Sequence, residues 1–437
     1  MAKLPLLFFT GVACLFAAAP ESISSTFTRD VAPILQDHCQ GCHRAGEVAP
    51  MSLITYKEVR PFAAAIKEAV SLRKMPPWFA DPHYGTFSND RRLSQRDIDT
   101  LVSWTKTGAA EGDPKDLPPP KHFLEGWNIK QPDVVLHMPA AFQVPETGVL
   151  DYQYILVPGK FDKDVWVQMA EVRPGNRAVL HHVIAFVRPP GSKWLASLKP
   201  GVPYVPGKDE SEMNDAAFLV GYAPGVPAMI LTSGRAKLIK AGSDIIFQMH
   251  YTTNGHAGTD RTSIGLSVVD PASVKERVLT VAATTKDFAI PPHDPNYQVD
   301  AEIQFASDTK IVEMLPHMHL RGKDFEYKAI YPNGTSQTLL RVPHYSFSWQ
   351  LTYIPEKDIR IPQGTTIHAI AHYDNSVNNP ANPDPTKTVQ YGDQSWDEMM
   401  FGFFDIAVAK DMDLRDLFPK RKEEATNTAA MPKKAGN

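Results

Sequence analysis

The string Cys39-Gln-Gly-Cys42-His43 constrains this chain more than any other feature, because it can tether a prosthetic group covalently. C-x-x-C-H is the attachment signature of c-type haem. Two thioether bonds would fix the porphyrin, and His43 would be the proximal ligand of the iron. Zinc would normally need two further cysteines or histidines in a tidy pair nearby, and a thiol redox pair would need a βαβ context. The sequence offers neither, so the motif predicts one covalent haem c.

A sixth ligand for the iron is expected among the methionines that follow the motif. Met75 lies in the proline-stiffened stretch Lys74-Met75-Pro76-Pro77-Trp78. A thioether in such a loop is the arrangement that small cytochromes c use to raise the potential. Met75 is therefore the predicted ligand. Met51 is the weaker candidate, and a plain core role for Met75 is the alternative.

The first residues are organised as an export signal. Lys3 supplies a positive charge, an apolar run follows over 6–16, and Ala17-Ala18-Ala19 offers a cleavage region. We expect a signal peptide over 1–22 and a periplasmic or secreted location in a bacterium, with Cys14 leaving a lipoprotein as a weaker alternative. The run is too short to span a bilayer comfortably, and nothing later resembles a membrane helix. The mature protein is therefore expected not to span a membrane.

The hydrophobic pattern changes along the chain and predicts several domains. Residues 23–115 have helical spacing around the haem motif, which predicts a small all-α domain. A polar, proline-rich linker is expected over 116–127. Short alternating runs with glycine, proline and asparagine turns then predict two all-β antiparallel sandwiches, over 128–278 and 279–412. The charged tail, 413–437, is expected to be disordered. A formal net charge of −4 gives no reason to expect nucleic acid as a partner.

Histidines cluster in two apolar runs of the first predicted sandwich. His181 and His182 are adjacent in one run, and His250 lies in another. Adjacent strand residues point to opposite faces, so one ion can bind both only at a twisted or terminal position. A lone histidine in such a run would more readily be a core residue. Three of them together predict a shared metal site.

The second predicted sandwich contains His317-Met318-His319, which has a different geometry. Alternation along a strand places both imidazoles on one face, about 6 to 7 Å apart, where a single metal can bridge them. Met399 could add a thioether, and imidazole with thioether favours copper, particularly Cu(I). On spacing alone, Met399 is more readily a core residue. His368 and His372 share a strand face and could supplement this site, although a structural role is the expected one.

These groups resemble, in the same order along the chain, the type II, ascorbate-dependent copper monooxygenases, represented by peptidylglycine α-hydroxylating and dopamine β-monooxygenases. The resemblance extends over roughly residues 128–410. It implies two jelly-roll-like sandwiches that face each other across a solvent-filled cleft, each with one copper. It implies that the first copper transfers electrons, whereas the second binds dioxygen and performs the chemistry. The implied ligands are His181, His182 and His250 for the first copper, and His317, His319 and Met399, after Asp397-Glu398, for the second.

The chain departs from those enzymes in three respects. The animal enzymes are rich in disulfides, whereas this chain has no cysteine left for such bonds. No arginine occurs in the run 311–316 before His317, so peptide and phenethylamine substrates are not carried over. The helical domain is foreign to them and resembles small bacterial cytochromes c.

Together these features predict an exported copper-dependent monooxygenase. It would hydroxylate a C–H bond of an unknown small-molecule or peptide substrate with dioxygen. An external one-electron donor would reduce the haem, which would replace ascorbate as the immediate reductant of two copper ions. The main alternative is a periplasmic copper-binding or electron-transfer protein without hydroxylase activity. A haem-based sensor or interaction module is the third possibility.

Overall fold

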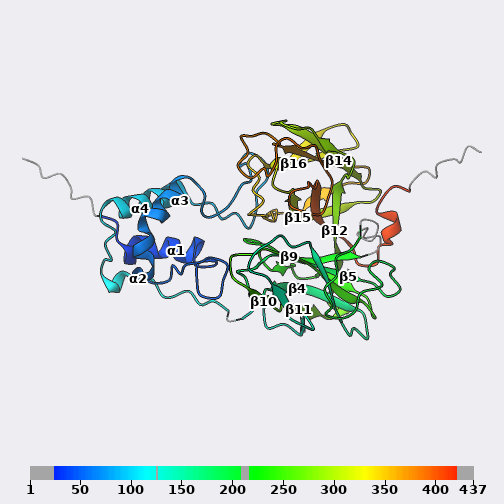
Figure 1. Ribbon diagram of the computed structural model, residues 1–437, viewed down its shortest axis with the longest axis horizontal. Helices are drawn as coiled ribbons and strands as arrows, with labels where there is room; N and C mark the ends of the chain where they lie inside the picture. The colour runs from blue at the N-terminus through cyan, green and yellow to red at the C-terminus, as the bar shows by residue number, and fades with distance from the viewer. Residues whose placement is uncertain (1–23, 125, 208–215, 421–437) are drawn as a thin grey trace, which may run out of the picture. The chain divides into compact units, whose positions relative to one another are not determined.

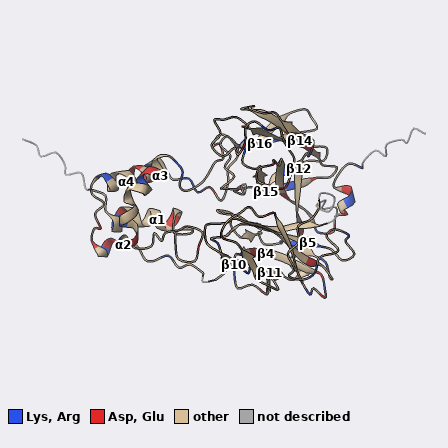
Figure 2. Cartoon of the chain, in the orientation of Figure 1, with Lys and Arg blue, Asp and Glu red and all other residues tan. Residues whose placement is uncertain are grey.

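The computed structural model describes residues 24–124, 126–207 and 216–420 (Figure 1). The expected signal peptide lies outside the described residues, as does the tail beyond position 420. The chain divides into two compact units. Among the described residues, the smaller unit consists of residues 24–45, 49–74 and 93–121, and the larger unit contains the others. Figure 2 shows basic and acidic residues mixed in both units, in agreement with the small net charge.

Helices make up the smaller unit. Their bounds are η1 Phe27–Val31, α1 Ala32–His38, α2 Tyr56–Val59, η2 Arg60–Phe62, α3 Ala63–Ser71, α4 Gln95–Lys106 and η3 Pro114–Asp116. α2 begins with a capping box between Thr55 and Glu58, and the Ser94 side chain caps α4. Leu35 and Trp104 are fully buried in its core, so apolar positions at helical spacing face inward. Within the described part of the chain, no helix has the length and apolar character needed to cross a membrane.

Residues 75–92 do not belong to the helical unit, although the sequence placed them in a contiguous domain over 23–115. Trp78 and Phe87 are buried in the core of the second sandwich. Their rings contact Tyr353, with centroid distances of 4.9 and 5.7 Å. Burying these large aromatic rings decides where the segment packs, whichever domain precedes it in the sequence.

Strands dominate the larger unit. Their bounds are β1 Val134–His137, β2 Phe142–Val144, β3 Gln153–Val157, β4 Val165–Arg173, β5 Leu180–Arg188, β6 Ala217–Tyr222, β7 Met229–Ile230, β8 Arg235–Ile239, β9 Asp244–Tyr251, β10 Gly258–Asp260, β11 Ser263–Val269, β12 Glu276–Thr284, β13 Ala289–Ile290, β14 Tyr297–Gln304, β15 Thr309–His317, β16 Gly322–Ile330, β17 Ser336–Val342, β18 Ile359–Ile361, β19 Thr366–Tyr373, β20 Val389–Gln390 and β21 Phe401–Ala409. Two 3₁₀ turns, η4 Pro271–Ser273 and η5 Leu414–Asp416, complete the unit.

These strands form two sandwiches that share one long sheet. That sheet has the order β1-β11-β4-β8-β12-β21-β15-β18, with β7 paired to β4. Its first half shares a hydrophobic core with the sheet β3-β9-β5-β6, and its second half shares another with β14-β19-β16-β17. Two short pairs, β10-β2 and β13-β20, lie outside these sheets. The prediction of β-sandwiches after the helical segment is therefore confirmed.

The predicted boundary between positions 278 and 279 falls inside strand β12, which belongs to the sheet that the two sandwiches share. β12 pairs antiparallel with β21 along its whole length and parallel with β8 at Glu276 and Arg277. Arg235 of β8 donates a hydrogen bond to Glu276 at 2.7 Å and pairs with Asp358. Within the stretch 413–437, which the sequence predicts to be disordered, the side chain of Leu417 is buried in the second core.

Candidate functional site

The first histidine cluster lies on two neighbouring strands, β5 and β9. His182 lies opposite His250 in the antiparallel ladder, and the register shifts between Leu180 and His182. This bulge resolves the difficulty that adjacent strand residues face opposite sides, because an extra residue re-aims the side chains beside it. The Nδ1 atoms of His181 and His182 are 3.2 Å apart, and those of His250 and His182 are 3.3 Å apart. The structure therefore brings together all three residues of the predicted site.

The nitrogen spacing of this cluster fits a metal ion. A tetrahedral ion with metal–nitrogen bonds of about 2.0 to 2.1 Å separates its nitrogen ligands by about 3.3 to 3.4 Å. Burial lowers the pKa of His181, and burial with the neighbouring imidazoles lowers the pKa of His182 well below its ordinary value. Burial, followed by the effect of His181, lowers the pKa of His250 to about 3. All three rings are thus held neutral, which is the form that binds metals.

The Tyr152 ring packs against this first cluster, although no sequence pattern singled it out. Its ring centroid lies 5.3 Å from that of His182 and 4.7 Å from that of His250. Its hydroxyl is buried and, among the described residues, has no hydrogen-bond partner. Burial and the nearby Asp393 raise the pKa of Tyr152 above its ordinary range, so the phenol stays protonated.

The second cluster forms where β15 ends. His317 is the last residue of that strand, and His319 follows two positions later, with ring centroids 5.2 Å apart. Nδ1 of His317 lies 2.8 Å from Oε1 of Gln350, and Nδ1 of His319 lies 3.4 Å from the carbonyl oxygen of Asp397. Because both partners are acceptors, each Nδ1 carries the proton and each Nε2 keeps its lone pair. Nε2 of His319 is buried without a hydrogen-bond partner among the described residues, so its lone pair is available to a metal.

Glu398 holds the second cluster together. Its carboxyl group accepts hydrogen bonds from the backbone N–H of His319 at 2.8 Å and of Arg321 at 2.6 Å. Burial raises the pKa of Glu398 to about 8, against the opposing effect of those N–H groups. The next residue, Met399, lines the same cavity as His317. Tyr373 donates to the carbonyl oxygen of Met399 at 2.7 Å. Two residues of the Asp397-Glu398-Met399 motif therefore contact His319, and the third lies in the wall of the cavity that His317 also lines.

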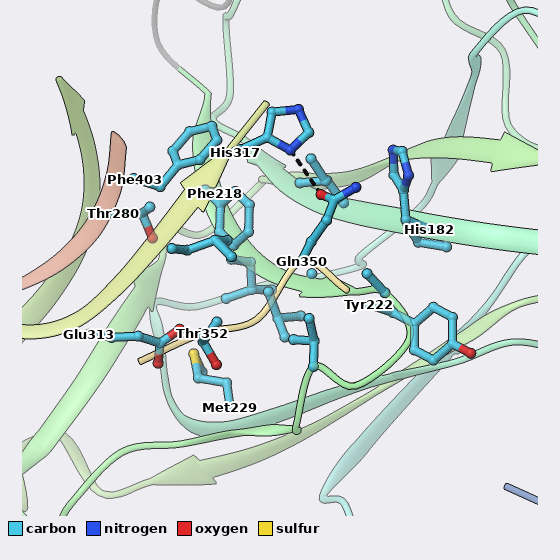
Figure 3. A pocket seen from close by; sticks show the side chains of 18 of the residues that line it. His182, Phe218, Tyr222, Met229, Thr280, Glu313, His317, Gln350, Thr352 and Phe403 are labelled. Atoms are coloured by element: carbon cyan, nitrogen blue, oxygen red, sulfur yellow. Dashed lines mark hydrogen bonds between the residues drawn. The ribbon is translucent and has the colours of Figure 1, made fainter. Parts of the chain in front are cut away.

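One aromatic ring separates the two clusters. Phe347 stacks on His181 with centroids 5.3 Å apart, and it meets His319 edge-on at 5.8 Å. The centroids of His181 and His319 are therefore no farther apart than these two distances added together. A cavity of about 320 Å³ opens beside them, lined by His182 from the first cluster and by His317 and Met399 from the second (Figure 3).

Two further histidines, His368 and His372, stand apart from this cavity. His368 bonds Asp300 at 2.9 Å, and His372 bonds Asp324 at 2.7 Å. Both carboxylates belong to strands that flank β19 in its sheet. The pairs are cross-strand contacts, in keeping with the structural role expected for them.

The C-x-x-C-H motif follows helix α1 in the helical unit. Cys39 is the C-cap of α1, and its carbonyl oxygen accepts from the N–H groups of Cys42 at 3.0 Å and of His43 at 2.9 Å. This turn holds the two thiols and the imidazole close in the chain. Nδ1 of His43 is buried and makes no hydrogen bond in the described part of the chain. Burial lowers the pKa of His43, which keeps the ring neutral.

The two methionines considered for the sixth position are assigned to different units. Met75 begins the segment that belongs to the larger unit, whereas Met51 packs against the core of the helical unit beside Cys39. Ligation by Met75 therefore stays a prediction.

Comparison with known proteins gives no family. No family model matches the chain, and no curated protein matches it. A solved structure of PNGF-II is 9% identical with a TM-score of 0.28; the match covers 63% of this chain and spans 65% of that protein. The infectious bursal disease virus structure of the Gx strain is 10% identical with a TM-score of 0.18, and covers 64% of this chain and 73% of that one. Likenesses this weak carry no argument about this protein.

Proposed function

We propose that this protein is an exported copper-dependent monooxygenase that hydroxylates a C–H bond of a small molecule with dioxygen. Its electrons would arrive from an external one-electron donor through a c-type haem in the helical unit. The two sandwiches would be the jelly-roll-like pair of the type II copper monooxygenases, and the helical unit would be cytochrome c-like. The proposal rests on the resemblance of the sequence to that family and on the geometry of the two histidine clusters.

The observation that carries the proposal is the pair of dissimilar ligand sets beside one cavity. Three Nδ1 atoms converge in the first set, whereas the second offers two imidazoles with Nε2 available and a methionine in the same cavity wall. Imidazole ligands suit copper, and an added thioether favours Cu(I). A protein that merely stored copper would have no need for two different sets that face a cavity of substrate size.

The residues have distinct roles under this proposal. His181, His182 and His250 would hold the copper that passes electrons, and His317, His319 and Met399 would hold the copper that performs the reaction. Bound copper and haem would supply one-electron redox chemistry and activation of dioxygen. Gln350 and Glu398 would orient the second ligand set. Gln350 accepts a hydrogen bond from Nδ1 of His317, and Glu398 accepts one from the backbone N–H of His319. The surrounding apolar wall would keep bulk water away from the reacting carbon.

The demand for electrons explains why a haem would be useful. Hydroxylation of R–H with O₂ yields R–OH and water, and it consumes two electrons and two protons. Haem iron and copper each carry one electron at a time, so a chain of one-electron centres fits this demand. Under this proposal, Cys39 and Cys42 would attach the haem, with His43 and Met75 as its axial ligands.

Metal content and oxygen consumption test the proposal. Protein exported from a host that attaches c-type haem is expected to contain one haem and two coppers, and to consume oxygen when a donor and a substrate are present. Met399→Ala should abolish substrate-dependent oxygen consumption while the haem is retained. Met412→Ala is the matched control, since Met412 packs against the same core and does not line the cavity. Zinc at the histidines, or no metal, would refute the proposal. Two coppers without any oxygen-consuming activity would favour the electron-transfer alternative.

A further inference from the structure

The cavity beside the second cluster is lined by side chains along strand β15. Glu313, Leu315 and His317 alternate on one face of that strand, and all three line the cavity. The segment 350–354 runs antiparallel beside them, because Met314 and Tyr353 exchange backbone hydrogen bonds. Gln350 therefore lies next to His317 at one end, and Thr352 lies nearer Glu313. Figure 3 shows His317 bonded to Gln350 at one side of the cavity, and Glu313 with Thr352 at the other.

The charged groups near Glu313, Lys237 and Asp405, form an ion pair with each other and share hydrogen bonds with Thr280. Lys237 donates to Thr280 at 2.8 Å and to the carbonyl oxygen of Leu219 at 3.1 Å, and it pairs with Asp405 at 3.0 Å. These three contacts use all three protons of the ammonium group. Thr280 in turn donates to Asp405. Lys237 therefore has no proton left to offer a carboxylate ligand, and no arginine occurs among the described residues that line the cavity.

Two polar side chains at this end are left without partners. Oγ1 of Thr352 is buried and has no hydrogen-bond partner among the described residues. Over the same residues, the Glu313 carboxyl makes no hydrogen bond with the protein, although it is enclosed and faces the cavity. Burial, with Asp405 adding to it, raises the pKa of the Glu313 carboxyl above its usual range. A protonated carboxyl and a hydroxyl side by side can each donate and accept one hydrogen bond.

We infer that the cavity binds an uncharged, mainly apolar molecule whose terminal hydroxyl group is held by Glu313 and Thr352, with its other end at His317 and Met399. The apolar wall between these two ends, which includes Phe218 and Phe403, would contact the hydrocarbon chain of the ligand. A carboxylate ligand would meet the carboxyl of Glu313 and find no free cation. The inference rests on the proposed function in naming the His317 end as the reacting end.

The length of the site limits the size of this ligand. Glu313 and His317 lie four positions apart along the strand, which places their Cα atoms about 13 Å apart. The cavity of about 320 Å³ lies at the small end of the range for ligand pockets. A straight-chain alcohol of about eight carbons is a suitable probe, since it can reach from the polar end toward the second cluster.

The inference is tested by calorimetric measurement of ligand affinity for the full-length protein, in the absence of oxygen and reductant. The probes are 1-octanol, octylamine and octanoate, which share a chain and differ in the polar end. Octanol is expected to bind most tightly. Thr352→Val and Glu313→Leu should each lower the affinity for octanol about two- to tenfold, as expected for one lost hydrogen bond. Glu302→Leu, at an exposed position of β14, is the matched control and should leave the affinity unchanged.

The outcomes separate this inference from the proposed function. Tighter binding of octylamine or octanoate than of octanol would overturn the inference, and so would octanol affinity that is unchanged in Thr352→Val. The latter variant keeps its side-chain shape, so it serves even if Glu313→Leu does not fold. Octanol binding to a protein that never consumes oxygen would refute only the hydroxylase proposal. Oxygen consumption with another substrate, and no octanol binding, would refute only the inference.

Discussion

The first histidine cluster turns three Nδ1 atoms toward one another, whereas the second turns its Nδ1 atoms away and leaves Nε2 available. The first set is assembled by a bulge between two hydrogen-bonded strands. The second is assembled at a strand end by polar partners that lie far away in the sequence, Gln350 and Glu398. The ladder gives a three-nitrogen set of which only His182 lines the cavity, whereas the strand end places both His317 and Met399 in the cavity wall.

This difference suggests a division of labour. An ion that only carries electrons benefits from ligands that do not move, and the paired strands β5 and β9 provide them. An ion that meets a substrate needs an open side, and a strand end beside a cavity provides it. The comparison also predicts that the two sets respond differently to loss of a ligand or of a supporting contact.

The largest expected effect is loss of one metal from either cluster. His250→Ala and His319→Ala should each reduce the copper content from two ions per chain to one, because each removes one of three ligands. Both variants should lose substrate-dependent turnover. They differ in that a prereduced His250→Ala protein should still bind dioxygen at its second cluster, which can be followed by a single-turnover assay.

The control for this pair is His256→Ala, since His256 is exposed and lies outside both clusters. It should keep two coppers and full turnover. If His250→Ala and His319→Ala both lost two ions, the clusters would form one joint site, and the contrast drawn between them would be wrong.

A smaller effect is expected from the support of the second cluster. Gln350→Leu keeps the volume of the side chain but removes the acceptor for Nδ1 of His317. Loss of such a partner typically lowers metal affinity or activity by about 10- to 100-fold. Copper titration with a competing chelator should show this fall at one of the two sites. Gln363→Leu, at an exposed position, is the control. An equal fall at both sites would argue against a separate support for the second.

The smallest effect is expected from the ring between the clusters. Phe347→Leu removes the ring contacts with His181 and His319 while keeping an apolar side chain. An aromatic pair contributes about 0.5 to 1.5 kcal/mol beyond its buried area, so the variant should lose about 1 to 2 kcal/mol of unfolding free energy. Chemical denaturation would measure this change, and copper content should stay at two ions. A Phe62→Leu variant of the helical unit controls for the loss of an aromatic ring. Loss of either copper would show that Phe347 positions a ligand.

The sequence predicted the arrangement of the molecule in order, because periodicity reports which side chains are buried. Alternating runs after position 128 became strands, and the spaced histidines came together. The adjacency of His181 and His182 looked unfavourable, since alternation separates neighbours. A bulge in β5 brings both side chains to the same site, and the residue pattern of β5 alone does not predict that bulge.

Other parts of the site depend on contacts between distant segments. Gln350 and Tyr152 occupy ordinary-looking stretches, and their importance comes from the histidines that they touch across the fold. The same reason moved residues 75–92 into the larger unit, where Trp78 packs with Tyr353. The predicted boundary at 278 falls inside β12, because strand pairing connects the two sandwiches there.

The parallel pairing of β8 with β12 has a consequence for how this protein can be divided. A cut between the sandwiches would expose two unsatisfied sheet edges and separate Lys237 from Asp405 across the junction. We therefore expect that neither half is stable by itself, and that the two histidine clusters unfold in one cooperative transition.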